Sequence, residues 1–389
     1  MKKICVFVGS RANYSSIKSV MMSVKNHPDL ELQLVLGASA VLDRFGKVED
    51  LIIKDGFVPN FTFHNIVEGE NPITMAKSTG LGLIEASSIL ANLKPDYVII
   101  VGDRFEMMSI TLAAAYMNIR IAHTMGGEVT GTIDESIRHA ITKFAHLHFA
   151  ASDDAKQRIL KLGEDPNYVF NVGCPRMDLV VNELKNDSQK VLSTLFQDFT
   201  GVGPSYLDLS KPFLLVSQHP VTTEFGNNRA QIEETLYALD ELQIPTIMLW
   251  PNIDAGSDDI STGIRVYREI YNKESDKWLK LFKNLPTHIY IHLMNSCACL
   301  VGNSSSGVRE GATIGTPVVN IGTRQNKREM GPNVINVGYN RHEIKEAILK
   351  QMEHGKYNNS FIYGDGNAGV QIADILAKSE PNIQKTITY

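Results

Sequence analysis

Short apolar segments alternate along the chain with longer segments in which apolar residues recur every three or four positions. The first apolar run, Ile4–Val8, predicts a buried strand, and the periodic segment Tyr14–Val24 predicts a helix with one apolar face. This alternation continues almost to the C-terminus. Further strands are predicted at Leu34–Leu36, Tyr97–Val101, Ile119–Ala122, Val169–Val172, Phe213–Ser217, Thr246–Trp250, Ala298–Val301 and Val318–Ile321.

Continuously apolar strands that alternate with helices indicate parallel sheets covered on both faces. A polar stretch from about residue 182 to 211 interrupts the pattern, which then restarts. Because 389 residues exceed what one compact core usually holds, we expect two domains, 1–178 and 179–367. The predicted fold class is α/β, with two Rossmann-like domains whose parallel sheets face a central cleft. Ligands of such sheets collect at the carboxyl ends of the strands.

Charge and composition exclude several classes of partner. The formal net charge of −5 offers no basic surplus for nucleic acid or an anionic membrane surface, and no apolar run is long enough to cross a bilayer. Arg11 interrupts the first apolar run too early for a signal peptide. The four cysteines are scattered, and Cys297 and Cys299 alternate as in a strand, which predicts reduced core thiols in the cytoplasm and no compact metal cluster.

Two motifs of the N-terminal half follow predicted strands. In Gly9-Ser10-Arg11, a glycine turn and a helix N-terminus could seat a phosphate, with Arg11 adding a charge, although a plain strand–helix turn also explains it. In Gly102-Asp103-Arg104, the charged pair sits at the end of a buried strand. One reading is a helix-capping salt bridge; the other places Asp103 at a sugar and Arg104 at phosphates.

A third motif, residues 123–135, is rich in glycine and carboxylates. Asp134 falls in the first turn of a predicted helix, where the helix dipole alone can explain a carboxylate. Glu128 stands on a glycine loop and lacks that explanation. The sequence therefore predicts that Glu128 serves in proton transfer, and that Asp134 either shares this role or only stabilises the helix start.

The C-terminal half carries its own strand-end motifs. His219 precedes a proline, which fixes an extended turn and presents the imidazole as an acid or hydrogen-bond donor. Ser304 and Ser305 follow the next apolar strand and open a helix, so they predict either an anion seat or simple helix capping. Glu310 could hold ribose hydroxyls, and Arg324 offers another guanidinium to a phosphate.

Together these motifs make the chain resemble the hydrolysing UDP-N-acetylglucosamine 2-epimerases of bacterial sialic-acid and legionaminic-acid pathways. The resemblance covers roughly residues 1–370. It implies the GT-B fold, with a C-terminal helix of about residues 368–389 that rejoins the first domain. It also implies a homodimer or homotetramer. By the resemblance, the residues that line the UDP site are Arg11, Ser15, Arg104, His219, Asn252, Ser304, Ser305, Glu310 and Arg324.

The resemblance further implies the chemistry. Asp103 and Asp134 match acidic residues that act on the sugar, whereas a third catalytic carboxylate of the family falls here on Met125. Glu128, three residues on, or another group then takes its place. Relatives that act on UDP-N,N′-diacetylbacillosamine share this His-Thr-Met-Gly-Gly-Glu variant, so that substrate is an alternative to UDP-N-acetylglucosamine.

The implied reaction inverts C2 and releases UDP and N-acetylmannosamine through a 2-acetamidoglucal, with no redox cofactor. Arginines and a serine-rich helix start would stabilise the departing diphosphate, and Asp103, Asp134, Glu128 and His219 would share the proton transfers. A GT-B glycosyltransferase would use the same kind of nucleotide seat with an acceptor, and it is the more distant alternative.

Overall fold

The computed structural model describes residues 1–43, 47–68, 72–129, 133–251, 256–283 and 285–388. The chain divides into two compact units. Unit 1 comprises Met1–Leu179 and Tyr363–Tyr389, and unit 2 comprises Val180–Ile362. Among the described residues, no helix combines the length and the apolar character that a bilayer span requires.

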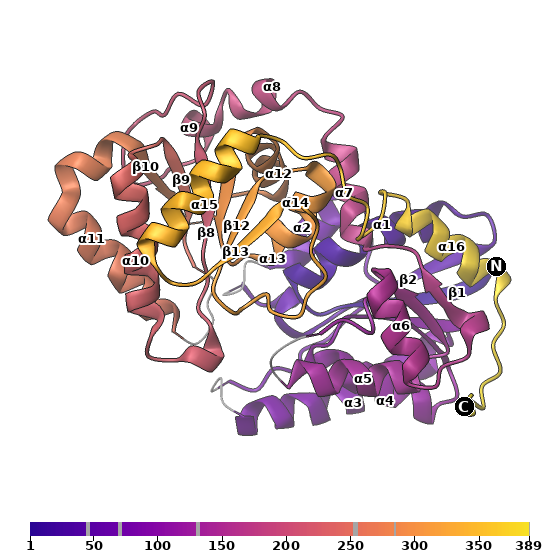
Figure 1. The fold of residues 1–389 in the computed structure, drawn as a ribbon. Helices are drawn as coiled ribbons and strands as arrows, with labels where there is room; N and C mark the ends of the chain where they lie inside the picture. Colours follow the sequence, from indigo (N-terminus) through magenta and orange to yellow (C-terminus); the bar gives the residue numbers. More distant parts are fainter. Residues whose placement is uncertain (44–46, 69–71, 130–132, 252–255, 284, 389) are drawn as a thin grey trace. The chain divides into compact units, whose positions relative to one another are not determined.

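Unit 1, coloured indigo to magenta with a yellow C-terminal segment in Figure 1, is built on a parallel sheet. The strand order of this sheet is β3-β2-β1-β4-β5-β6-β7. Its central strands are almost wholly buried because helices cover both faces. The strands are β1 (Lys2–Val8), β2 (Leu30–Leu36), β3 (Phe61–Thr62), β4 (Tyr97–Val101), β5 (Arg120–Thr124), β6 (Leu147–Ala150) and β7 (Val169–Asn171).

The helices of unit 1 begin at residues suited to a helix start. The side chain of Ser10 accepts a hydrogen bond from the backbone N–H of Asn13 and caps α1, and Ser152 caps α6 in the same way. The helices are α1 (Arg11–Asn26), α2 (Val48–Lys54), α3 (Pro72–Leu93), α4 (Phe105–Tyr116), α5 (Asp134–Phe144), α6 (Asp153–Lys161), α7 (Pro175–Glu183), which extends into unit 2, and α16 (Ala368–Lys378).

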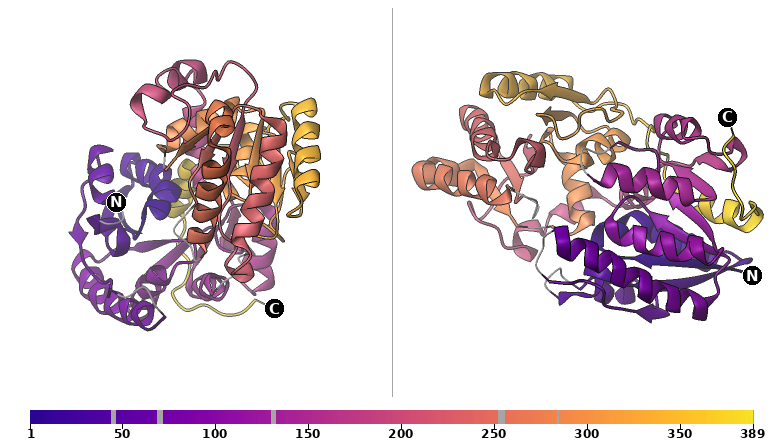
Figure 2. Two further views of the ribbon diagram at one scale, coloured as in Figure 1. Left: turned by 90° about the vertical axis from the view of Figure 1, so that its left-hand side faces the viewer. Right: turned by 90° about the horizontal axis from the view of Figure 1, so that it is seen from below.

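Unit 2 repeats this architecture with strand order β10-β9-β8-β11-β12-β13, again all parallel. Its strands are β8 (Leu214–Ser217), β9 (Thr246–Leu249), β10 (Leu279–Phe282), β11 (Cys299–Gly302), β12 (Val318–Ile321) and β13 (Val334–Val337). Its helices are α8 (Ser188–Leu192), α9 (Leu195–Asp198), α10 (Asn228–Leu242), α11 (Ser257–Trp278), α12 (Thr287–Ser296), α13 (Ser305–Val308), α14 (Glu310–Ile314) and α15 (Arg341–His354). Figure 2 shows the elements of both units from two further sides.

The C-terminal segment returns to unit 1 and is held there by polar contacts. Helix α16 packs against α1, and the carboxylate of Asp178 accepts hydrogen bonds from the first two backbone N–H groups of α16, at 3.0 and 2.7 Å. Beyond α16 the chain is not helical. The tail carbonyls of Ser379, Pro381 and Ile383 contact, in that order, the side chains of Tyr97, Arg120 and His146 at 2.7, 2.8 and 3.1 Å.

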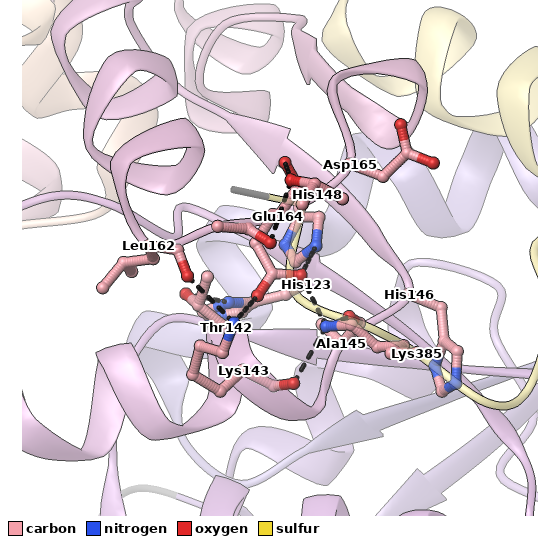
Figure 3. A network of polar contacts seen from close by, with 12 residues as sticks. His123, Thr142, Lys143, Ala145, His146, His148, Leu162, Glu164, Asp165 and Lys385 are labelled. Atoms are coloured by element: carbon pink, nitrogen blue, oxygen red, sulfur yellow. Dashed lines mark hydrogen bonds and ion pairs between the residues drawn. The ribbon is translucent and has the colours of Figure 1, made fainter.

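A buried carboxylate anchors the end of this tail (Figure 3). Glu164 lies within 3.0 Å of His148 Nε2, 2.6 Å of Lys143 Nζ and 2.5 Å of Lys385 Nζ. Burial opposes ionisation of Glu164, but these hydrogen bonds outweigh it and lower its pKa to about 2. One carboxylate thus joins α5, β6 and the tail.

Several local predictions were wrong. The predicted helix over 368–389 ends at Lys378. Cys297 and Cys299 do not share a strand, because Cys297 is the C-cap of α12 and β11 begins at Cys299. All four cysteines belong to the described residues, are buried and form no disulfide. His148 lies in β6, a strand that the sequence analysis missed because the alternation Leu-His-Phe-Ala places buried polar residues in a core strand.

Candidate active site

In unit 1 the candidate residues follow β1, β4 and β5, and the strand order reverses between β1 and β4. In open sheets of this kind, the loops on either side of such a reversal run in opposite directions, and ligands bind at the carboxyl ends of the strands. Gly9 begins the loop after β1, and a Cβ atom added to it would lie 2.9 Å from Cγ of Glu106 in α4. The loop after β1 therefore packs against the start of α4, and a larger residue at position 9 would force the Glu106 side chain to shift.

Asp103 and Glu128, from the loops after β4 and β5, meet through one arginine. The guanidinium of Arg138 donates from Nη2 to Asp103 and from Nη1 to Glu128, the latter at 3.3 Å. Arg138 and Glu128 are only 4% and 8% exposed. A buried guanidinium between two carboxylates offsets their repulsion and fixes both side chains.

Arg104 is turned towards a different carboxylate. Its Nε donates to Oε1 of the buried Glu106 at 2.8 Å. Asp134, the first residue of α5, is near enough to interact electrostatically with both Arg104 and Glu106. Burial raises the pKa of Glu106. The positive charge of Arg104 opposes this rise, and the negative charge of Asp134 adds to it. The alternative of an Asp103–Arg104 salt bridge is therefore not confirmed, because Arg104 pairs with Glu106 and Asp103 pairs with Arg138.

His123, at the end of β5, supports the loop that carries Asp103. Its Nε2 lies 2.7 Å from the carbonyl oxygen of Gly102, which can only accept, so this nitrogen carries the hydrogen. Its Nδ1 lies 3.2 Å from the hydroxyl of Thr142. Burial lowers the pKa of His123 to about 3, so the imidazole is neutral near neutral pH.

Arg11 and Ser15 stand on the first turns of α1. Arg11 is exposed, and the hydroxyl of Ser15 donates to the Arg11 carbonyl at 3.0 Å. No contact in the described residues joins either of them to the Asp103–Arg138–Glu128 group, so their predicted UDP contacts stay predictions.

In unit 2 the candidate residues also gather where the strand order reverses, between β8 and β11. The backbone N–H of His219 donates to Oδ1 of Asn303 at 2.7 Å, and Nδ2 of Asn303 donates to the His219 carbonyl at 2.8 Å. This reciprocal pair locks the two strand ends together. Burial and the nearby Arg324 lower the pKa of His219 to about 3, which favours a neutral hydrogen-bonding group over a proton-donating imidazolium.

Hydroxyl groups of the turn after β11, Ser304 to Ser306, hydrogen-bond to one another and to Tyr290. The Ser304 side chain caps α13 and lies 2.8 Å from Ser306 Oγ, which in turn lies 2.8 Å from the hydroxyl of Tyr290. Ser305 is half-buried in the first turn of α13, and Glu310 is buried at the start of α14.

Arg324 reaches the same turn. Its Nη1 donates to the carbonyl of Asn303 at 3.2 Å, and the neighbouring Gln325 donates to that oxygen at 2.8 Å. The structure thus brings together His219, Asn303, Ser304 and Arg324 in unit 2. Asn252, also predicted to contact UDP, lies outside the described residues.

Three residues of these groups were not given roles by the sequence: Glu106, Arg138 and Asn303. Each lies close in sequence to a motif that was recognised. Arg138 follows Asp134 by four positions, which places both on one face of α5. Its partners come from other elements, however, so the local sequence gave no sign of the bridge.

Comparison with known proteins identifies the fold and then the family. A crystal structure of UDP-GlcNAc 2-epimerase from Neisseria meningitidis bound to UDP-GlcNAc is similar to this chain, with a TM-score of 0.79, 18% identity and coverage of 97% of this chain and 100% of that one. The two parallel-sheet α/β domains are therefore those of a GT-B-like fold. The sequence profile of the UDP-N-acetylglucosamine 2-epimerases matches residues 22–377, and the chain belongs to this family.

Two relatives with assigned activities match 90% or more of the chain. A UDP-N-acetylglucosamine 2-epimerase of Neisseria meningitidis is 28% identical over 383 residues, which cover 98% of this chain and 96% of the relative. A GDP/UDP-N,N′-diacetylbacillosamine 2-epimerase (hydrolyzing) of Campylobacter jejuni is 32% identical over 353 residues, which cover 90% of this chain and 87% of the relative. The family resemblance predicted from the motifs is confirmed.

Proposed function

We propose that this epimerase is hydrolysing: it inverts C2 of UDP-N-acetylglucosamine and releases UDP and N-acetylmannosamine. The observation that carries the proposal is the pair of carboxylates, Asp103 and Glu128, held by Arg138. Asp134 and Arg104 stand beside them. Unit 1 therefore combines proton-transfer groups with a cation suited to a phosphate.

The chemistry explains why both kinds of group are needed. The C2 proton of the sugar is not acidic until the C1–O bond to UDP breaks and positive charge grows on the ring. As UDP leaves with that electron pair, a carboxylate takes the C2 proton, and the C–H electrons form the C1=C2 bond of a 2-acetamidoglucal. Water then adds its oxygen to C1, and a proton returns to C2 from the opposite face. Stabilising the departing diphosphate and placing acid and base groups are thus two parts of one task.

The proposal assigns the groups of each unit to these parts. In unit 1, Asp103, Asp134 and Glu128 share the proton transfers, and Arg104, with Arg11 and Ser15, contacts the diphosphate. In unit 2 the nucleotide contacts are Ser304, Ser305 and Arg324. Glu310 binds the ribose hydroxyls, and His219 forms a hydrogen bond near the leaving group. The neutral state of His219 suits this last role. Asn252 is proposed as a further UDP contact.

Product analysis tests the reaction. Incubated with UDP-N-acetylglucosamine and no acceptor, the enzyme should release UDP and free N-acetylmannosamine, identified by NMR. In deuterated water the product should carry deuterium at C2, and in oxygen-18 water it should carry the label at C1. Retention of the original C2 hydrogen would contradict the elimination, a product still attached to UDP would indicate a non-hydrolysing epimerase, and a need for an acceptor would indicate a glycosyltransferase.

A variant of Asp103 tests the assignment of roles. Asp103→Asn should lower turnover far more than it weakens UDP binding, because the carboxylate serves the sugar and not the nucleotide. Equal losses in turnover and in affinity for UDP, measured by calorimetry, would make Asp103 a binding residue.

A second candidate substrate is UDP-N,N′-diacetylbacillosamine, with the same chemistry. It is favoured by Met125, which stands where the resemblance implies a carboxylate, and by the hydrolysing relative named for this sugar at 32% identity. Met125 is a buried apolar side chain, 9% exposed, so no carboxylate stands at this position. Comparing kcat/KM for the two nucleotide sugars decides between them.

A further inference from the structure

Glu106 is a buried carboxylate that the proposed reaction does not use. It lies in the first turn of α4 and is 1% exposed, packed against Gly9 of the loop after β1. Its Oε2 is buried and has no hydrogen-bond partner among the described residues. A carboxylate in such a place is unfavourable unless its charge stabilises something else.

The group that it stabilises is Arg104. Glu106 receives the Nε–H of Arg104 at 2.8 Å, and this is the only hydrogen bond of the Arg104 side chain within the described part of the chain. The two terminal nitrogens, Nη1 and Nη2, are left to make other contacts. The Arg104 side chain is 49% exposed, whereas the Glu106 side chain is 1% exposed. The ion pair therefore has a buried, fixed end and an accessible end.

This geometry suits the recognition of a diphosphate. A guanidinium binds phosphate through two parallel N–H groups, and an arginine that is already fixed through Nε loses less side-chain entropy on binding. Held in this way, Arg104 presents its terminal nitrogens, Nη1 and Nη2, at the carboxyl ends of β1 and β4, where ligands of such sheets bind.

We propose that Glu106 is a positioning residue that fixes Arg104 for the diphosphate of the nucleotide sugar. The proposal rests on the proposed function, because it takes a UDP-sugar as the ligand. The proposal predicts that loss of the Glu106 charge weakens UDP binding, whereas charge repulsion alone predicts the opposite. Removing a negative charge near a phosphate site should tighten anion binding, whereas losing the support of Arg104 should weaken it.

A double-mutant cycle separates these effects. Glu106→Gln keeps the shape of the side chain, and it should raise the Kd for UDP about tenfold, the difference expected between a charged and a neutral hydrogen bond to Arg104. In an Arg104→Ala background the same substitution should cause no weakening, because there is then no guanidinium to position. Glu106→Asp keeps the charge but shortens the side chain, and it should also weaken UDP binding.

The matched control is Glu233→Gln. Glu233 accepts from Nε of Arg229 at 2.9 Å, the same atom pair at an exposed site of unit 2, and its loss should leave the Kd for UDP unchanged. Thermal unfolding confirms that each variant is folded. Equal weakening by Glu106→Gln with and without Arg104, or tighter binding in the presence of Arg104, would overturn the inference.

Failure of the positioning role and failure of the proposed reaction give different results. If the wild-type chain binds UDP and the cycle behaves as expected but no free sugar is released, the hydrolysing reaction is wrong and the positioning role stands. If the wild-type chain does not bind UDP, both are wrong.

Discussion

Nε2 of His148 lies 3.0 Å from a carboxylate oxygen of Glu164, and the two side chains are only 2% and 1% exposed. Two lysines share the same carboxylate. Because they already neutralise Glu164, burial dominates at His148 and lowers its pKa. The core of unit 1 thus contains an ionised glutamate and a neutral histidine side by side (Figure 3).

This arrangement predicts how stability depends on pH. The pKa values of His123, His146 and His148 are lowered in the folded chain, to about 3 for His123, from about 6.5 when unfolded. Below pH 6.5 the unfolded chain therefore binds more protons, and the free energy of unfolding should fall as the pH is lowered from 7 to 5. His123 alone should contribute about 2 kcal/mol to this fall. The depressed pKa of Glu164 adds a further loss between about pH 4.5 and 2.

Urea unfolding at several pH values checks this dependence. His148→Gln keeps a hydrogen-bond donor for Glu164 but does not titrate, so its stability should fall less steeply between pH 7 and 5. His354→Gln, at an exposed position, is the control and should leave the slope unchanged. An unfolding free energy that rises towards pH 5 would contradict the prediction.

The tail contact to Glu164 can be tested with Lys385→Met. The substitution keeps the apolar stem of the side chain but removes one of the two hydrogen-bonded lysine cations from a buried carboxylate, so unit 1 should lose about 1–3 kcal/mol of stability. Differential scanning calorimetry measures the change. Lys378→Met, at an exposed position at the end of α16, is the control. The same unfolding temperature for both variants would mean that the tail contributes nothing.

Arg138 should be indispensable for turnover. Arg138→Met leaves Asp103 and Glu128 close together without their shared cation, so we expect kcat to fall at least a hundredfold and the stability to fall by about 3–5 kcal/mol. Adding Glu128→Gln removes the repulsion, and the double variant should regain stability but not activity. Recovery of both would show that Arg138 has only a structural role.

Substitutions at two glycines with similar φ angles can distinguish backbone strain from steric clash as the cause of destabilisation. Gly102 and Gly127 have φ values of +70° and +73°. A Cβ atom at Gly102 meets nothing within 4 Å, whereas one at Gly127 would lie 2.2 Å from the carbonyl oxygen of Ala155. Gly102→Ala should destabilise the chain by about 1–2 kcal/mol. Gly127→Ala should destabilise it more and should lower kcat, because the loop that carries Glu128 must shift. Equal unfolding free energies would contradict this account.

Prediction from the sequence was most successful for buried central strands. Tyr97–Val101 and Val318–Ile321 were predicted with the bounds that the structure shows, because continuous apolar runs between turns are typical of parallel strands. It failed for β3, β6, β10 and β13, which include polar or exposed positions. Their place in the sheet depends on neighbouring strands and not on their own composition.

The sequence by itself determined that the chain alternates strands and helices, where most central strands run, and that its polar motifs follow strand ends. These are local properties, because periodicity and turn residues act within a few positions of one another. Only the tertiary structure decided which motifs meet. The pairing of β4 with β5 brings Asp103 and Glu128 to the same arginine, and the packing of α4 against the loop after β1 buries Glu106. Such contacts depend on the order of strands in the sheet, which no stretch of sequence specifies alone.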